Sequence, residues 1–204
     1  MAEPTPFELR PALVDDAGGI ARTYIDSWRG AYRGILPDGV LDGMNLERER
    51  TSWRRVIASG LAQHRVLVLA PPKGGVAGFL TYGADRSRRG PVRSAEGEVF
   101  TLYVAPGHQG RGGGRRLMAG AAEAMRAEGY RSLILWVLGL NERARGFYES
   151  LDGESAGERT TSVGGSRLAL VGYRWPELEA LEEAAARLSQ IRLPAPLDRV
   201  APGA

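Results

Sequence analysis

Hydrophobic positions along the chain follow two kinds of spacing, and their order predicts a mixed α/β domain. Seven short runs are rich in Val, Leu, Ile and aromatic residues and are bounded by turn residues, as strands are. They are Phe7–Ala12, Arg65–Ala70, Val76–Tyr82, Glu98–Val104, Ser132–Leu138, Glu158–Val163 and Arg167–Tyr173. Turn residues at 71–75 and 164–165 predict antiparallel hairpins between the runs that flank them.

Other segments repeat apolar residues every three or four positions, which predicts helices. The first helix is expected to run from a cap at Asp15 or Asp16 to about Ser27, with a turn-rich connection following from Trp28. The remaining predicted helices are Asn45–Ser59, Arg115–Glu128 and a C-terminal helix that opens at Trp175-Pro176-Glu177, with proline in its first turn. The apolar stripe of this last helix comprises Leu178, Leu181, Ala185 and Leu188.

The segments 98–104, 115–128 and 132–138 form a strand, a helix and a strand in succession. Such a βαβ unit makes its two strands parallel neighbours. Alternation along the first strand is expected to place Glu98, Phe100, Leu102 and Val104 on one face. The predicted fold class is α/β (α+β): a mixed, mostly antiparallel central sheet of about seven strands, with a parallel central pair and helices on both faces.

Composition limits the kinds of protein this chain can be. With 204 residues, 43% of them hydrophobic, it is long enough for one globular domain with a sizeable core. We expect this domain over residues 1–175, and a helix and tail at 176–204 that dock on it or on a second subunit of a homodimer. With no cysteine and only two histidines, His64 and His108, the chain is expected to hold no metal.

The N-terminal segment lacks the basic and apolar regions of a signal peptide. The longest apolar runs, such as Leu133–Leu138, are far shorter than a membrane span. We therefore expect a soluble, cytoplasmic protein without a membrane partner. The net charge is only +3, and the basic residues are scattered, so a nucleic-acid partner is not favoured.

The segment Val104–Leu117, which reads VAPGHQGRGGGRRL, links a predicted strand to a predicted helix. Five of its residues are glycines: Gly107, Gly110, Gly112, Gly113 and Gly114. The first N–H groups of a helix have no intrahelical partner and lie at the positive end of its dipole. Glycines let ligand oxygens approach the backbone closely, so this segment predicts a site for an anionic phosphate group.

Two familiar phosphate-binding motifs do not fit the segment. A nucleotide P-loop ends in Gly-Lys-Ser/Thr, whereas this loop ends in Gly114-Arg115-Arg116. The dinucleotide motif Gly-x-Gly-x-x-Gly fails because its third glycine would fall on Arg115 or Leu117. A third pattern, Gln/Arg-x-x-Gly-x-Gly/Ala after a strand, fits at every specified position over Gln109–Gly114. This pattern resembles the GNAT family of N-acetyltransferases.

A second segment strengthens the resemblance. Asn141, Ala144, Phe147 and Tyr148 match the family segment Asn-x-x-Ala-x-x-Phe-Tyr, although no phenylalanine follows Gly153 as the family pattern requires. The resemblance implies that the two parallel strands splay apart and that acetyl-CoA lies in the gap, with its pyrophosphate at the glycine loop. The implied coenzyme-binding residues are Leu102, Tyr103, Val104, Gln109, Gly110, Arg111, Gly112, Gly113, Gly114, Arg115, Asn141 and Arg145.

Acetyl transfer to an amine needs a neutral nucleophile, and an amine with a pKa near 10.4 is almost fully protonated at neutral pH. Glu98 is the candidate base, because the family often keeps a glutamate at this end of the strand; alternatively it is a solvated carboxylate. Tyr148 is the candidate acid that protonates the departing thiolate, or else a core residue. Trp28 and Tyr32 are expected to border the acceptor site, or to be ordinary packing residues.

The leading hypothesis is an N-acetyltransferase that moves the acetyl group of acetyl-CoA to a primary amine of a small molecule or peptide by direct attack in a ternary complex. A non-catalytic acyl-CoA sensor would keep the loop but needs neither acid nor base. The arginines in the polar stretch 83–97 are Arg86, Arg88, Arg89 and Arg93; they suggest a solvated loop or a rim that selects an anionic acceptor. Asp26, Asp38 and Asp42 favour the reverse, a cationic amine.

Overall fold

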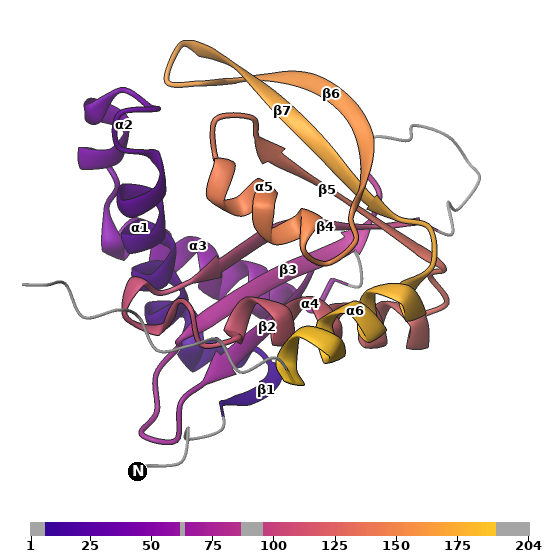
Figure 1. The fold of residues 1–204 in the computed structure, drawn as a ribbon. Coiled ribbons are helices and arrows are strands. Elements are labelled where there is room, and N and C mark those ends of the chain that lie inside the picture. The colour runs from indigo at the N-terminus through magenta and orange to yellow at the C-terminus, as the bar shows by residue number, and fades with distance from the viewer. Residues whose placement is uncertain (1–6, 62–63, 87–95, 191–204) are drawn as a thin grey trace, which may run out of the picture.

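The computed structural model describes residues 7–61, 64–86 and 96–190, which form one seven-stranded sheet with helices on both faces (Figure 1). The strands are β1 (Glu8–Pro11), β2 (Arg65–Ala70), β3 (Gly78–Ala84), β4 (Glu96–Val104), β5 (Ser132–Leu138), β6 (Glu154–Val163) and β7 (Ser166–Trp175). The helices are α1 (Ala17–Tyr32), α2 (Asp38–Asp42), α3 (Leu46–Ser59), α4 (Gly113–Ala127), α5 (Glu142–Glu149) and α6 (Leu178–Gln190), with 3-10 turns at η1 (Val14–Asp16) and η2 (Pro106–His108).

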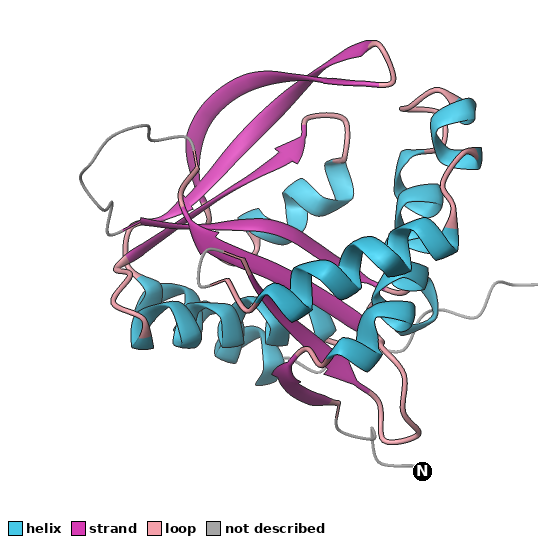
Figure 2. Cartoon of the chain, turned by 180° about the vertical axis from the view of Figure 1, so that it is seen from behind, coloured by secondary structure: helices cyan, strands magenta, loops and turns pink. Residues whose placement is uncertain are grey.

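The strand order is β1-β2-β3-β4-β5-β7-β6, and every neighbouring pair is antiparallel except β4 and β5. Two hydrophobic cores attach the helices. One joins α4, α5 and α6 to the sheet through buried side chains such as Leu117 and Leu181. The other joins α1 and α3 to the opposite face through Ile20 and Trp53 (Figure 2). The predicted fold class is therefore confirmed.

The parallel pair separates part-way along its length. β4 and β5 are paired only from Glu96 opposite Ser132 to Val99 opposite Leu135, yet β4 continues to Val104 and β5 to Leu138. Beyond Val99 the two halves of the sheet diverge (Figure 2). The backbone edges that face each other across this gap are available to a ligand, as the sequence resemblance implied.

A β-bulge at Phe100 overturns one sequence prediction. On β3, Thr81 lies opposite Thr101 and the next residue, Tyr82, lies opposite Val99, so Phe100 is an extra residue in β4. A bulge reverses the alternation of side chains beyond it. Val99 therefore joins Leu102 and Val104 in the core on the α4 side, and Glu98 points to the opposite face. The prediction that Glu98 shares a face with Leu102 and Val104 is wrong.

Helix α1 continues five residues beyond Ser27, to Tyr32, where the sequence predicted a turn-rich connection. Long-range contacts offset the cost of Gly30 inside the helix. Trp28 Nε1 donates a hydrogen bond to the Tyr103 hydroxyl at 2.9 Å, and Tyr32 is buried in a small core with Leu36 and Leu41 of the α1–α2 region. These contacts bring the end of α1 over the gap in the sheet.

The start of α1 also differs in detail. Asp16 occupies its N-cap position but makes no side-chain cap bond to the helix. Its carboxylate instead accepts hydrogen bonds from the Arg10 guanidinium and from the Leu13 N–H, each at 2.7 Å. By contrast, Asn45 caps α3 by accepting from the Arg48 N–H at 3.0 Å.

The boundaries of the central strands depend on side chains that bond across the sheet. β4 begins at Glu96, two residues before the predicted start, and the Arg174 Nε donates to the buried Glu96 carboxylate at 2.7 Å. β7 extends to Trp175, whose Nε1 donates to the Leu151 carbonyl at 2.7 Å. Helix α6 consequently begins at Leu178, so the prediction that Pro176 lies in its first turn is wrong.

Helix α6 packs on the sheet domain of its own chain. Leu178 and Leu181 are fully buried in the same core as Leu117 and Met125 of α4. The side chain of Leu188, the tail from residue 191, and Arg88, Arg89 and Arg93 lie outside the described part of the chain. In the described ranges, no helix combines the length and apolar character that crossing a bilayer requires. Those ranges also contain no group of three or more His, Asp or Glu able to hold a metal ion.

Candidate active site

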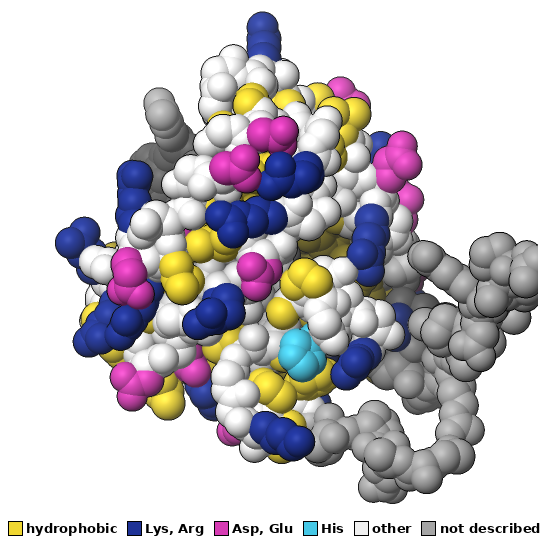
Figure 3. Space-filling view, turned by 90° about the vertical axis from the view of Figure 1, so that its left-hand side faces the viewer, with side chains coloured by type: hydrophobic (Ala, Val, Ile, Leu, Met, Phe, Trp, Pro, Cys, Tyr) yellow, Lys and Arg dark blue, Asp and Glu magenta, His cyan; other side chains and the backbone are white. Residues whose placement is uncertain are grey.

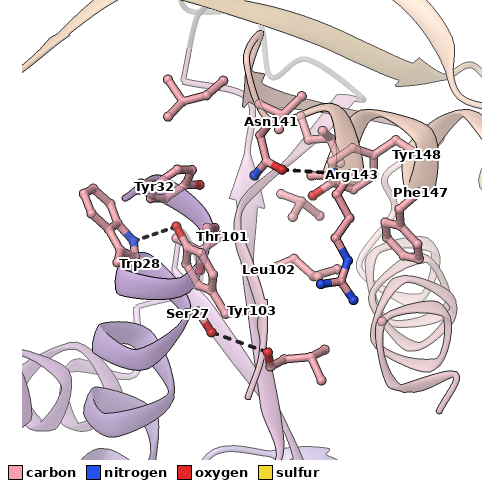
Figure 4. A pocket seen from close by; sticks show the side chains of 18 of the residues that line it. Ser27, Trp28, Tyr32, Thr101, Leu102, Tyr103, Asn141, Arg143, Phe147 and Tyr148 are labelled. Carbon is pink, nitrogen blue, oxygen red and sulfur yellow. Dashed lines mark hydrogen bonds between the residues drawn. The ribbon is translucent and has the colours of Figure 1, made fainter. Parts of the chain in front are cut away.

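A cavity of about 1010 Å³ opens where β4 and β5 part. It is bordered by α1, β4, the glycine loop, the first turn of α4, β5, α5 and β6 (Figure 4). The residues predicted for the site that line it are Glu98, Leu102, Tyr103, Val104, Gln109, Gly110, Gly112, Gly113, Gly114, Arg115, Asn141, Tyr148, Trp28 and Tyr32. Arg111 and Arg145 were predicted as well, but they are not among the lining residues.

The backbone of β4 presents polar groups to the gap. Ala105 donates its N–H to the Ala77 carbonyl at 2.9 Å, so Thr101, Tyr103 and Ala105 direct their backbone groups toward β3. Leu102 and Val104 therefore direct theirs toward the gap. The Val104 carbonyl accepts a hydrogen bond from Gln109 Nε2 at 2.9 Å. The Val104 N–H and the backbone N–H and C=O of Leu102 therefore remain to face the cavity.

The glycine loop brings several N–H groups to one end of the cavity. Gly110 and Gly112 have φ angles of 74° and 79°, a left-handed conformation that glycine adopts without strain. Gly112 is the N-cap of α4, and the bond from Arg116 N–H to the Gly112 carbonyl, 3.1 Å long, is the first of that helix. The N–H groups that precede it have no helical acceptor and are suited to an anion.

Gly114 is needed for packing rather than for backbone conformation. A Cβ atom at this position would lie 3.1 Å from Cζ of Phe147. The absence of a side chain lets the Phe147 ring lie against the first turn of α4. This contact fixes α5, with Asn141 and Tyr148, relative to the glycine loop.

The arginines around the loop differ in their positions. Arg115 lines the cavity, and among the described residues its buried Nε has no hydrogen-bond partner. Arg111 is exposed. Arg145 donates instead to the Tyr173 hydroxyl at 3.4 Å and to the Gly139 carbonyl at 3.3 Å. Arg143, rather than Arg145, lines the cavity.

Sequence reasoning missed Arg143, although a signal was present. Arg143 and Phe147 are four residues apart, so they lie on one face of α5. Phe147 belongs to the segment that matches the family pattern. Its spacing from Arg143 therefore indicated that Arg143, rather than Arg145, lies on the same face of the helix as Phe147. Asn141 is the N-cap of α5, where its Oδ1 accepts from the Ala144 N–H at 3.1 Å.

Tyr148 lies at the wall of the cavity with its ring against Phe147, Tyr173 and Trp175. Burial raises the pKa of the Tyr148 phenol well above its usual value, and the nearby Tyr32 adds to the effect. The phenol therefore stays protonated at neutral and mildly alkaline pH. A group in this state can donate a proton but cannot serve as a base.

Glu98 is 3% exposed and lines the same cavity. Its Oε2 accepts from the Arg86 N–H at 2.9 Å. The Arg86 Nε lies 3.6 Å from Oε2, and the Arg159 Nη2 lies 4.0 Å from Oε1. Neither arginine was predicted as a partner of Glu98. Only the tertiary structure brings Arg159 of β6 within reach of Glu98 of β4.

Trp28, Tyr32 and Tyr103 form an aromatic group on the α1 side of the cavity, opposite Asn141, Phe147 and Tyr148 (Figure 4). Burial raises the pKa of Tyr103 and of Tyr32, so both phenols remain neutral. On the face that carries α1 and α2, basic and acidic side chains are interspersed (Figure 3).

Comparison with known proteins identifies the family. Residues 26–153 match the model of the acetyltransferase (GNAT) family. The chain belongs to this family. It is 32% identical over 174 residues to the uncharacterized N-acetyltransferase YuaI of Bacillus subtilis, covering 85% of this chain and 95% of that protein. The predicted family and N-acetyltransferase activity are thereby confirmed.

Solved structures share the fold of this acetyltransferase. PaiA N-acetyltransferase from Thermoplasma acidophilum, in complex with coenzyme A, is 18% identical with a TM-score of 0.62, over 83% of this chain and 99% of that one. YncA from Salmonella typhimurium, solved with acetyl-CoA, is 20% identical with a TM-score of 0.63, over 94% of this chain and 98% of that one.

Proposed function

We propose that this acetyltransferase carries the acetyl group of acetyl-CoA to a primary amine of a small molecule or peptide by direct attack in a ternary complex. The observation that carries the proposal is that one and the same cavity has the amides of the glycine loop at one end and Glu98 and Tyr148 along its walls. The structural neighbours PaiA and YncA, solved with coenzyme A and acetyl-CoA, support the choice of co-substrate.

The residues at the loop fit a coenzyme diphosphate. The N–H groups between Gln109 and Arg115 would donate to its oxygens, and the partnerless Arg115 Nε supports a charge-assisted contact there. A hydrogen bond to a charged group contributes about 1.5–3 kcal/mol, so a few of them account for much of the affinity. Arg143 of α5, on the same helix as Phe147, would supply a further cation at the cavity wall.

The backbone of β4 would hold the pantetheine arm. The amide groups of the arm can pair with the backbone of Leu102 and with the Val104 N–H as a neighbouring strand would, because β5 is not paired with this part of β4. Asn141 lies beside the same path and is fixed by its capping bond. Gln109 has a supporting role, since its side chain bonds to the Val104 carbonyl and holds the loop against β4.

A protonated amine loses two protons in becoming an amide, and one proton must reach the departing sulfur. Among the described residues that line the cavity, Glu98 is the buried carboxylate, and we assign it the uptake of the amine proton, directly or through water. The neutral amine then attacks the thioester carbonyl, and the C–S bond breaks. Tyr148, kept protonated by burial, donates a proton to the thiolate as it leaves. The second proton, which the nitrogen loses as the amide forms, returns to the Tyr148 oxygen directly or through water.

Two measurements on the purified protein test this function. Calorimetry with acetyl-CoA reports whether the coenzyme binds, and release of free CoA thiol in the presence of a panel of primary amines reports transfer. We expect micromolar-range uptake and amine-dependent thiol release. Uptake without release for any amine would favour the acyl-CoA sensor, and no uptake would contradict the coenzyme site itself.

A further inference from the structure

Two arginines and one glutamate from separate strands and loops meet on the wall of the cavity. We call Arg86, Glu98 and Arg159, with the rings of Phe100 and Trp136, the arginine–glutamate cluster; all five line the cavity. Arg86 follows β3, Glu98 and Phe100 belong to β4, Trp136 to β5 and Arg159 to β6. The cluster therefore surrounds the point where β4 and β5 begin to separate.

The cluster lies on the side of the sheet opposite α4. Leu135 and Val137 of β5 are buried in the core under α4, so Trp136 between them points to the other face. Val99 is in that core too, so Glu98 points away from α4 as well. The amides at the start of α4 hold the coenzyme in the proposed function. The opposite side of the gap is left for the acceptor.

Both guanidinium groups lie over aromatic rings. The Arg86 Cζ is 3.6 Å from the centre of the Phe100 ring, and the Arg159 Cζ is 4.1 Å from the centre of the Trp136 ring. This cation–π contact holds each guanidinium over its ring and uses none of its N–H groups as hydrogen-bond donors. A ligand anion can then bind along the edge in the two-pronged geometry that suits carboxylate and phosphate.

Glu98 does not use up these donors. The side-chain contacts from Arg86 and Arg159 to Glu98, 3.6 Å and 4.0 Å, are longer than hydrogen bonds. The side chains of the two arginines remain 60% and 40% exposed. Asp85 also acts electrostatically on Arg159, and it already has another interaction. The cluster thus offers one carboxylate for a cationic amine beside two cations for an anion.

The cavity is also closed on the side of the β6–β7 turn. Tyr32, Leu36 and Leu41 share a small core with Leu168 of β7. At the tip of the hairpin, a Cβ on Gly164 would lie 2.3 Å from a methyl group of Val40, so α2 and the turn are in direct contact. This bridge crosses the end of the gap and closes the cavity on that side.

We propose that the acceptor is a small amine that carries a carboxylate or phosphate group, with its anion on Arg86 and Arg159 and its amine at Glu98. This inference rests on the proposed acetyl transfer and specifies its substrate class. Arg86 was among the arginines predicted to form either a solvated loop or a rim for an anionic acceptor, whereas Arg159 was not predicted. The opposing prediction is a purely cationic amine drawn by Asp26, Asp38 and Asp42, and the experiment separates the two.

The experiment compares matched amines on the wild-type enzyme with acetyl-CoA. The carboxylate arm uses the common amino acids and dipeptides, each beside its C-terminal amide and its decarboxylated amine. The phosphate arm uses O-phosphoethanolamine and amino-sugar phosphates beside their dephosphorylated forms. We expect kcat/KM to be at least tenfold higher for the anionic member of the pairs in one arm. Equal or better turnover of the uncharged or purely cationic members would overturn the inference.

Variants then locate the anion site. Arg159→Gln and Arg86→Gln should each lower kcat/KM for the anionic acceptor roughly 10- to 100-fold, the effect of one charge-assisted contact. The KM for acetyl-CoA should stay unchanged, and the preference for the anionic over the neutral member of each pair should fall by the same factor. Arg159→Lys should restore part of the loss, because it keeps the charge without the planar fork. Arg167→Gln, an exposed arginine on the same hairpin, is the control.

The two levels of the proposal fail in different ways. The acceptor class is overturned if the protein binds acetyl-CoA but acetylates only amines that lack an anion. It is also overturned if the protein binds acetyl-CoA but acetylates no amine of the carboxylate or phosphate arm. Absence of acetyl-CoA uptake overturns the proposed function beneath it. If a glutamine variant does not fold, the wild-type comparison of matched amines still decides the question.

Discussion

Glu98 and Tyr148 occupy different electrostatic surroundings within one cavity, and this difference is what separates their proposed roles. Tyr148 lies among aromatic rings with a raised pKa, so its proton is retained until a strong base such as a thiolate appears. Glu98 faces two guanidinium groups and a backbone N–H. Its charge is matched by fixed partners, which keeps a buried carboxylate in place beside an incoming ammonium.

Replacing Tyr148 by Phe removes the proposed acid while keeping the ring. We expect kcat to fall roughly 10- to 1,000-fold, up to the range of a positioned general acid, with little change in the Kd for acetyl-CoA. Steady-state kinetics and calorimetry measure the two quantities. The control is Tyr82→Phe, whose hydroxyl donates to Glu128 at 3.2 Å away from the cavity lining. A Tyr148 variant with wild-type kcat would exclude this residue from the reaction.

Replacing Glu98 by Gln removes the proposed base. Transfer would then depend on amine that is already neutral, a fraction that rises about tenfold per pH unit below the amine pKa. We expect a steeper rise of kcat/KM between neutral and alkaline pH than in the wild type. Glu142→Gln, which alters an exposed carboxylate at the same cavity, is the matched control. Superimposable pH profiles for Glu98→Gln and the wild type would show that no base is needed at this position.

The glycine loop and α4 form the structural element on which coenzyme binding depends. Their geometry joins two requirements that have separate causes. Gly112 must adopt a left-handed conformation before α4 begins, and Gly114 must lack a side chain so that Phe147 can approach. A loop that met only the first requirement would present its amides but would leave α5 misplaced.

The conformational requirement gives a matched pair of variants. Gly112→Ala and Gly60→Ala each force a side chain into the left-handed region, with φ angles of 79° and 57°. Both should lose about 1 kcal/mol of folding stability, measured by chemical denaturation. Only Gly112→Ala should weaken acetyl-CoA binding, by about tenfold or more, since its strain shifts the amides of α4. Equal coenzyme affinity in the two variants would contradict the proposed diphosphate site.

At the scale of the whole molecule, the two halves of the sheet are joined firmly at one end and only bridged at the other. Pairing of β4 with β5 and the buried Glu96–Arg174 contact join them at the closed end. The α1–α2 region meets the β6–β7 hairpin across the open end. Helix α6 contributes to the same core as α4 and so supports the closed end from below.

The contribution of α6 to this core can be measured. Leu181→Ala should destabilise the protein by about 2–5 kcal/mol, because Leu181 is fully buried and its removal leaves a cavity. Leu61→Ala, at a leucine that is 59% exposed, should change stability by less than about 0.5 kcal/mol. Urea denaturation compares the two. A similarly small loss for both would mean that α6 is only loosely attached to the domain.

The amino-acid sequence by itself determined the features that depend on neighbours along the chain. The glycine spacing at Gln109–Gly114, the capping residues Asn45 and Asn141, and the alternation of apolar runs each act over a few residues. Local steric and hydrogen-bond preferences are enough to specify them. The family resemblance and the parallel central pair followed from these same short segments.

Only the tertiary structure decided which residues share the cavity. The bulge at Phe100 turns Glu98 to the face opposite Leu102, and no alternation rule anticipates a single inserted residue. The extension of α1 and the meeting of Arg86 with Arg159 both rest on contacts between distant segments. Such contacts gain their energy only when the sheet has formed, so the free energy that selects them is a property of the folded molecule and not of any one stretch of sequence.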